Sequence, residues 1–220
     1  MNFRHEYKHS INYADYISSS SRLRAVLKPD LYASEKGMYE VRTLYFDNTD
    51  DKVLREKLNG ESRREKFRIR YYNNSPHFIQ LEKKSRIYGL CIKHRTDISR
   101  EQCESLLAGK WGFLNDSGDP LFLELYGKMI YLQLRPKMIV DYTREAYVFP
   151  AGNVRVTLDG NIRTSLNSTD FFNPDLPMIS TGDRILEVKY DSFIPQAVTD
   201  VIQICRCTSS FSKYAACRLI

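Results

Sequence analysis

The chain has 220 residues, a formal net charge of +6 and a pI of about 9.0. Because 42% of the residues are hydrophobic and 27% are charged, we expect a globular protein, most simply one domain spanning residues 1–220, and not a disordered chain. The positive charge favours an anionic partner without identifying it, so nucleic acid, acidic lipid and phosphate-rich small molecules all stay open.

Membrane-spanning and disulfide-bonded classes are not indicated. No apolar run approaches the ~18 residues of a transmembrane helix, and the first residues are too polar for a signal peptide. The five cysteines show no zinc-like spacing, and their odd number without a secretory signal predicts reduced thiols in a cytoplasmic protein, with a place at the inner face of the membrane open through a partner. These cysteines are Cys91, Cys103, Cys205, Cys207 and Cys217.

The first third of the chain predicts two strands and two helices. Residues 4–9 are typical of an opening strand with Glu6 and Lys8 on one face. Asn12 is a candidate cap for a helix over 13–27, which Pro29 ends. Residues 40–47 are rich in β-branched and aromatic residues and predict a strand, and a short helix is expected over 51–58.

A hairpin is predicted next, with strands over 67–72 and 79–84 and a turn over 73–76. Apolar and cationic residues alternate in its first strand, so Arg68 and Arg70 lie side by side on one face. Two neighbouring arginines repel each other, and we therefore expect an anionic group between them. The alternative is that both simply face water on a half-solvated sheet.

The remainder of the chain repeats this pattern. A strand is predicted over 90–95, and Ser99 with Gln102 matches a capping box for a helix ending near residue 108. Residues 115–120 predict a polar loop and 121–134 a helix. Alternating strands follow over 138–144, 153–159 and 185–190, with a long loop over 165–183. Helices are expected over 195–205 and 211–219.

Many strands with one ionic and one apolar face fit two architectures. A sandwich would bury the apolar faces and expose the ionic ones. A barrel would line its interior with the ionic faces, and outer helices would cover the apolar ones. An interior rich in Arg and Lys suits a polyanion, because guanidinium groups match phosphate oxygens in pairs, and its carboxylates would hold Mg²⁺ or Mn²⁺.

Six segments in series resemble the VTC domain, the polyphosphate polymerase domain of the vacuolar transporter chaperone complex. They span 67–72, 81–84, 140–144, 154–159, 186–189 and 211–214, within a resemblance that covers about residues 4–219. This family belongs to the triphosphate tunnel metalloenzymes. The resemblance implies an α+β fold in which an antiparallel β-barrel encloses a tunnel and helices pack outside.

The resemblance also implies roles for individual residues. Arg68 and Arg70 would bind the phosphates of the nucleotide and of the chain, and Glu187 would hold the divalent metal, Mn²⁺ or Mg²⁺. The other cations expected in phosphate binding are Lys8, Lys84, Lys93, Arg144, Arg155, Lys189 and Lys213. The set expected to act in catalysis is Arg68, Arg70, Lys84, Arg144, Arg155 and Lys213.

The resemblance to the VTC domain implies a polymerase that transfers the terminal phosphoryl group of ATP to inorganic polyphosphate, with no specific nucleic-acid partner. This sequence departs from the family pattern at two places, and these departures leave other functions open. Ser210 stands where polymerases can carry a second lysine, and only Glu6 and Lys8 remain of the longer Glu-x-Glu-x-Lys opening of related hydrolases. A tri- or polyphosphate hydrolase, a non-catalytic polyphosphate-binding module and a sheet-surface nucleic-acid binder stay open. Any translocation would need a membrane-protein partner, and the oligomeric state is left open.

Overall fold

The computed structural model describes residues 4–30, 37–166, 168–203 and 210–220. Its strands are β1 (His5–Ser10), β2 (Lys28–Pro29), β3 (Met38–Asp47), β4 (Arg63–Tyr72), β5 (Ser75–Ile87), β6 (Leu90–Asp97), β7 (Arg135–Phe149), β8 (Val154–Thr164), β9 (Ile179–Ser180) and β10 (Ile185–Tyr190). Its helices are α1 (Tyr13–Val26), α2 (Lys52–Leu58), α3 (Arg100–Leu107), α4 (Gly112–Asp116), α5 (Pro120–Tyr131), the 3₁₀ turn η1 (Ala151–Asn153), α6 (Gln196–Val201) and α7 (Lys213–Arg218).

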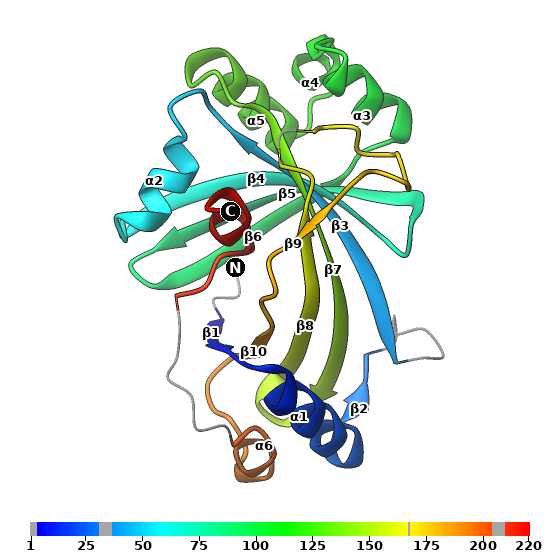
Figure 1. Cartoon of the computed structure of the whole chain (residues 1–220). Coiled ribbons are helices and arrows are strands. Elements are labelled where there is room, and N and C mark those ends of the chain that lie inside the picture. The colour runs from blue at the N-terminus through cyan, green and yellow to red at the C-terminus, as the bar shows by residue number, and fades with distance from the viewer. Residues whose placement is uncertain (1–3, 31–36, 167, 204–209) are drawn as a thin grey trace.

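One strongly curled antiparallel sheet organises the chain (Figure 1). Its strand order is β1-β10-β8-β7-β3-β4-β5-β6, with β2 added to β7 and β9 to β8. The two edges of this path come together at an isolated bridge between Arg4 and Cys91. The predicted α+β fold with a barrel-like antiparallel sheet is therefore confirmed, in the form of a half-barrel whose edges meet at that bridge.

The central hairpin is confirmed and is longer than predicted. Its turn residues Asn73 and Asn74 have φ of 53° and 50°, the left-handed values that a tight hairpin turn requires and that asparagine tolerates. Ladder pairing then extends from Tyr72 opposite Ser75 to Arg63 opposite Ile87. This length carries the ionic face of the hairpin well beyond Arg68 and Arg70.

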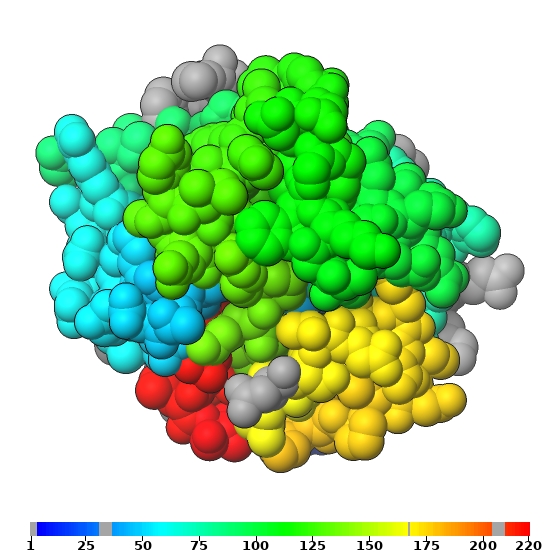
Figure 2. All heavy atoms as spheres, turned by 90° about the horizontal axis from the view of Figure 1, so that it is seen from above, coloured from blue at the N-terminus to red at the C-terminus, as the bar shows by residue number. Residues whose placement is uncertain are grey.

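Many apolar side chains of the sheet point outward, where helices cover them, while another apolar cluster that includes Val41 and Val140 lies on the concave side with α2 and α7. Helices α3, α4 and α5 pack on β3, β4 and β5, where Ile69, Leu81 and Leu125 are fully buried. Figure 2 shows these helices and the segment 168–183 covering one face of the molecule. Helices α1 and α6 bury Leu23 and Val198 against the outer side of β8 and β10. The ionic sides of the same strands are left on the concave face.

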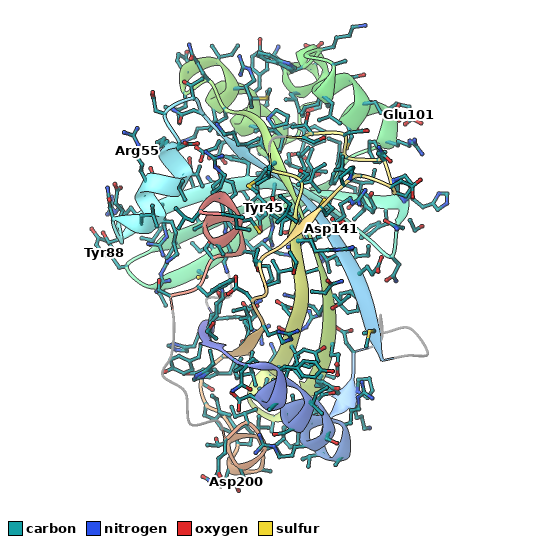
Figure 3. The ribbon with its side chains drawn as sticks, viewed as in Figure 1. Tyr45, Arg55, Tyr88, Glu101, Asp141 and Asp200 are labelled. Carbon is teal, nitrogen blue, oxygen red and sulfur yellow. The ribbon has the colours of Figure 1, made fainter. Side chains whose placement is uncertain are left out.

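Helix α7 packs against the concave face. Figure 3 labels Tyr45 of β3, next to α7. The Tyr45 ring contacts that of Tyr214, with ring centroids 5.2 Å apart. The Tyr214 hydroxyl donates to Asp47 at 2.6 Å, and the same carboxylate accepts the backbone N–H groups of Val53 and Leu54 at the start of α2. Asp47 therefore fixes α2 and α7 together beside the concave face.

Several predicted boundaries differ from the structure. Residues 115–120, expected as a loop, include the end of α4 and the start of α5, because Asp119 caps α5 by accepting from Leu121 and Phe122. Helix α5 ends at Tyr131, and Arg135 and Pro136 belong to β7. The predicted loop 165–183 contains β9, and the predicted helix 195–205 is α6, shorter at both ends.

Three cysteines, Cys91, Cys103 and Cys217, are free thiols as expected, while Cys205 and Cys207 lie outside the described residues. Within the described part of the chain, no helix combines the length and apolar character needed to cross a membrane.

Candidate phosphate-binding cavity

The alternation of β4 sets the chemistry of the concave face. Phe67, Ile69 and Tyr71 are at most 3% exposed and point into the outer core. Their neighbours Arg68 and Arg70 therefore point to the other side, together with Lys66. The same logic places Arg144 of β7 and Glu187 of β10 on this side, opposite their outward-facing neighbours.

These side chains line one cavity of about 330 Å³, here called the central cavity. It brings together every residue predicted for the site, from seven strands and α7: Lys8, Arg68, Arg70, Lys84, Lys93, Arg144, Arg155, Glu187, Lys189 and Lys213. Eleven Lys and Arg side chains line it, against the two carboxylates of Glu6 and Glu187. The cavity therefore has a large excess of positive charge, which an anionic ligand would offset.

The anion expected between Arg68 and Arg70 is partly supplied by the chain itself. Glu82 of β5 is fully buried, and its carboxylate lies 2.6 Å from Arg68 Nη2 and 3.9 Å from Arg70 Nη1. Lys93 donates to its other oxygen at 2.6 Å. Burial raises the pKa of a carboxyl, but these three cations hold the pKa of Glu82 far below its ordinary value. Glu82 thus fixes three cations while leaving them at the cavity surface.

A second buried carboxylate, that of Asp159, fixes two cations on the opposite wall of the cavity. Arg144 donates to both oxygens of Asp159, with Nε–Oδ1 and Nη2–Oδ2 distances of 2.6 and 2.7 Å. Lys213 Nζ of α7 lies 2.5 Å from Asp159 and 4.6 Å from the centre of the Tyr142 ring. Although burial opposes ionisation, Arg144 and Lys213 lower the pKa of Asp159 to about 2. The pairing holds Arg144 and Lys213 on neighbouring parts of the wall.

Two carboxylates face the cavity itself, beside three lysines. Lys8 Nζ lies 2.9 Å from Glu6 and 4.0 Å from Glu187, and Lys84 Nζ lies 2.8 Å from Glu6. Lys189 Nζ is 3.1 Å from Glu187. Burial opposes the charge of Glu187, but Lys189, Lys8 and other cations keep its pKa well below the usual range.

Lys189 shows the opposite balance, since burial outweighs its carboxylate neighbours and lowers its pKa to about 8. Its protonation therefore responds to small changes in the charge of its surroundings. Arg155 lies at the rim of the cavity. Its Nη2 is 2.5 Å from Asp30 and donates to the Tyr39 hydroxyl at 2.9 Å, and its side chain is 35% exposed. It is the predicted site arginine with the best access to solvent.

Five charged residues at or behind the cavity wall were not predicted for the site from the sequence: Arg4, Glu6, Lys66, Glu82 and Asp159. The signal was present, because Lys66 shares the alternation of Arg68 and Arg70 and Glu82 stands directly opposite Arg68 in the ladder. A solvated ion pair on an exposed sheet would give the same sequence pattern. Only the curl of the sheet, which buries this face, distinguishes such a surface pair from a buried pair at the cavity.

The two carboxylates of this wall fit a divalent metal that is held by the protein together with a phosphate substrate. Glu187 and Glu6 offer ionised, hard oxygen ligands of the kind that Mg²⁺ and Mn²⁺ prefer, and Mg²⁺ is commonly held by one or two carboxylates together with substrate phosphates. No group of three or more acidic, histidine or cysteine side chains forms a protein-only site among the described residues. Substrate oxygens would have to complete the coordination.

The curled sheet and its concave face define a class of α+β proteins that enclose a cavity lined by cationic side chains. The chain belongs to the VTC domain family, whose profile matches residues 3–220. This membership points to phosphate- or polyphosphate-related activity. The comparison with curated proteins gave no match.

Solved structures of similar overall shape have low sequence identity. A putative adenylate cyclase from Bacillus halodurans is 15% identical, with 86% of this chain and 82% of that chain covered and a TM-score of 0.49. The Mimivirus capping enzyme triphosphatase is 13% identical, with 93% and 91% covered and a TM-score of 0.45. A Pyrococcus horikoshii protein is 13% identical, with 90% and 84% covered and a TM-score of 0.44. All three TM-scores are below 0.5, so we draw no conclusion about this chain from these structures.

Proposed function

We propose that the protein is a polyphosphate polymerase-like phosphotransferase. It transfers the terminal phosphoryl group of ATP to the end of a phosphate chain and releases ADP. The observation that carries this proposal is the excess of Lys and Arg over carboxylates around one cavity of a VTC-family fold. Both substrates are linear polyanions, so one cationic cavity can hold the donor and the acceptor end to end.

Positioning and charge neutralisation are the main requirements of this reaction. Arg68 and Arg70 on one wall and Arg144 on the other present guanidinium groups that Glu82 and Asp159 already orient. Preoriented donors stabilise charge that develops on the transferred group without reorganising during the reaction. A divalent metal at Glu187 would supply further charge neutralisation when bound. The bond from the γ-phosphorus to ADP breaks as the terminal chain oxygen forms its bond to that phosphorus.

A tri- or polyphosphate hydrolase is the second candidate, because Glu6 adds a carboxylate beside Glu187 on the cavity wall. In that reaction water replaces the chain as the acceptor, and free phosphate is the product. A binding module without turnover would use the same cations. The products separate the three functions.

The test is incubation of the pure protein with ATP and Mn²⁺, followed by measurement of ADP, free phosphate and stained phosphate chains on a gel. We expect ADP to form in step with chain phosphate. Glu187→Gln keeps the shape of the side chain and removes its charge, so we expect a folded but less stable protein, because Lys189 loses its buried partner, together with retained metal-free tripolyphosphate binding and loss of turnover. The matched control is Glu124→Gln, since Glu124 pairs with Lys83 on the outer side of the sheet and should leave turnover unchanged.

Release of free phosphate without formation of phosphate chains would show a hydrolase instead of a polymerase. Tripolyphosphate binding with no turnover in the wild type would leave only the binding module. Wild-type turnover in Glu187→Gln would remove the metal role of that carboxylate.

A further inference from the structure

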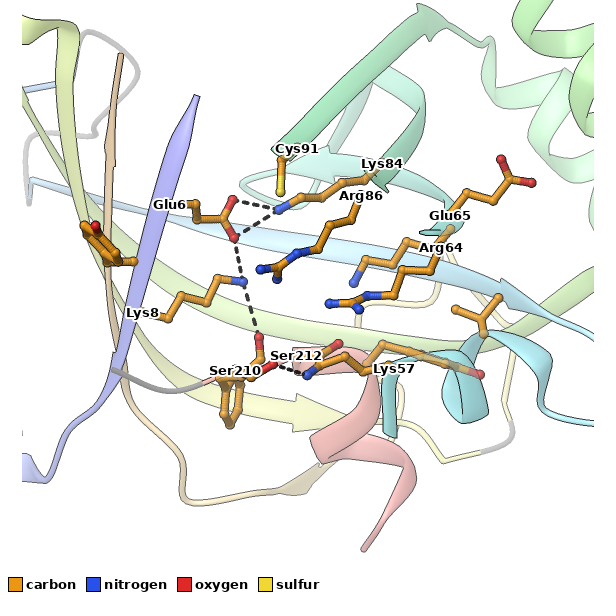
Figure 4. A pocket seen from close by; sticks show the side chains of 15 residues that line it. Glu6, Lys8, Lys57, Arg64, Glu65, Lys84, Arg86, Cys91, Ser210 and Ser212 are labelled. Carbon is orange, nitrogen blue, oxygen red and sulfur yellow. Dashed lines mark hydrogen bonds and ion pairs between the residues drawn. The ribbon is translucent and has the colours of Figure 1, made fainter. Parts of the chain in front are cut away.

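A second cavity of about 410 Å³, here called the side cavity, adjoins the central cavity (Figure 4). The two share part of their lining: Glu6, Lys8, Lys66, Lys84, Cys91 and Ser212. Because these residues border both spaces, a ligand that reached from the central cavity into the side cavity would pass between them and stay on the concave side of the sheet. None of the cations that line the side cavity alone was predicted for the site.

Those cations come from three elements. Lys57 lies on α2, Arg64 on β4 and Arg86 on β5. Figure 4 shows the Arg64 and Arg86 guanidinium groups and the Lys57 amine directed toward one space. Arg64 and Arg86 are direct cross-strand partners, as are Lys66 and Lys84 two residues further along the ladder. Like charges directly opposite each other destabilise a sheet, so this arrangement is not explained by stability.

The two carboxylates that line the side cavity, Glu6 and Glu65, are already paired with other lysines. Glu65 pairs with Lys83 at 3.0 Å and also with Lys128, while Glu6 pairs with Lys84 and Lys8. Within the described residues, no ion pair involves Lys57, Arg64 or Arg86, in contrast to Arg68 and Arg144 of the central cavity.

The contacts of the side-cavity cations are with neutral groups. Lys57 donates to the Ser210 hydroxyl at 2.6 Å, and Arg64 to the Glu61 carbonyl at 2.6 Å. Burial and then the neighbouring cations, including Arg86, lower the pKa of Lys57 and of Arg64. Glu56 and Glu61 act on Arg64 from beyond ion-pair distance, so this cluster lacks the direct carboxylate pairing that the cations of the central cavity have.

We propose that the side cavity binds further phosphate groups of a linear phosphate chain whose end lies in the central cavity, with Lys66 at the junction. This inference rests on the proposed function and deepens it, because it gives the site a preference for chain length. Tripolyphosphate can be held by the central cavity alone. A longer chain gains the contacts of Lys57, Arg64 and Arg86.

The test compares tripolyphosphate with a longer polyphosphate of defined length by metal-free calorimetry. The variant is Lys57→Gln, Arg64→Gln and Arg86→Gln combined. The control combines Arg55→Gln, Arg95→Gln and Lys110→Gln, which removes the same charge from exposed positions that line neither cavity. Arg55 lies on α2 as Lys57 does and projects from the outer side of the molecule (Figure 3). Melting without ligand checks the fold of each variant.

We expect the side-cavity variant to bind the longer chain about tenfold or more weakly than the control variant does, because charge-assisted contacts are lost. Both variants should bind tripolyphosphate equally. Equal affinity of the two variants for the longer chain would overturn the inference while leaving the proposed function intact. Wild-type protein that fails to bind tripolyphosphate would instead overturn the proposed function. If the triple variant has a lowered melting temperature, affinity for the longer chain is compared instead between two single variants, Arg86→Gln and Arg55→Gln. Both positions are exposed.

Discussion

Glu82→Gln is the change that most sharply separates a ligand-binding cavity from a set of structural ion pairs. The substitution keeps the shape of a fully buried side chain and removes the charge that Arg68, Arg70 and Lys93 share. Breaking a buried ion pair by removing one partner typically costs about 3–5 kcal/mol, because the other charge stays buried without a counter-ion. We therefore expect a large loss of stability.

The loss can be expressed as a melting temperature. For a chain of this length, 1 kcal/mol corresponds to about 2–4 °C, so the predicted decrease is roughly 6–20 °C. Ligand should recover part of it. Phosphate oxygens can replace the lost carboxylate, and a tenfold gain in affinity would add about 1.4 kcal/mol to the stabilisation by saturating ligand. Tripolyphosphate should thus raise the melting temperature of Glu82→Gln more than that of the wild type.

The assay is thermal unfolding with and without tripolyphosphate, in the absence of metal. Its control is Asp141→Asn. Asp141 is also buried and paired with an arginine, Arg42, at 2.8 Å, but on the outer side of the same sheet. We expect this variant to lose stability in the same way and to gain no more from tripolyphosphate than the wild type gains. An equal or smaller ligand shift in Glu82→Gln than in the wild type would refute the reasoning.

Two further predictions follow from single contacts. Metal-free affinity for tripolyphosphate should fall as the pH rises from about 7 to about 9, because Lys189, with a pKa of about 8, must be protonated to attract the anion; calorimetry on the wild type and on Lys189→Met should show a weaker dependence in the variant. Tyr214→Phe removes the hydrogen bond to Asp47 and should cost about 1–2 kcal/mol, measured by denaturant unfolding. The same change should weaken tripolyphosphate binding if α7 positions Lys213, and unchanged binding would contradict that positioning role.

The face of each strand could be predicted from alternation alone. Phe67 and Ile69 are apolar and Arg68 and Arg70 are cationic, so the two sides of β4 follow from the backbone geometry. The hairpin followed from Asn73 and Asn74, and the α3 capping box from Ser99 and Gln102, because these signals are local.

The closure of the cavity could not be predicted from local signals. Whether Glu82 and Glu187 form solvated ion pairs or line a buried space depends on the curl of the whole sheet and on the bridge between Arg4 and Cys91. The concave position of α7 likewise depends on the contact of Tyr214 with Asp47, which are far apart in the sequence. Family resemblance supplied this information where periodicity could not.

The side cavity had no sequence signal of its own. Arg64 and Arg86 become neighbours only through the register of a hairpin longer than predicted, and Lys57 joins them because Asp47 holds the start of α2 beside the sheet. A lysine on a short helix is otherwise most simply a solvated surface group.

The most direct measurement of the central claim is a crystal structure of the protein with tripolyphosphate and Mn²⁺. We expect phosphate groups in the central cavity, in contact with Arg68, Arg70 and Arg144, and a metal ion shared between Glu187 and phosphate oxygens. Phosphate bound only on the outer side of the sheet, or a central cavity without phosphate at saturating ligand, would contradict it.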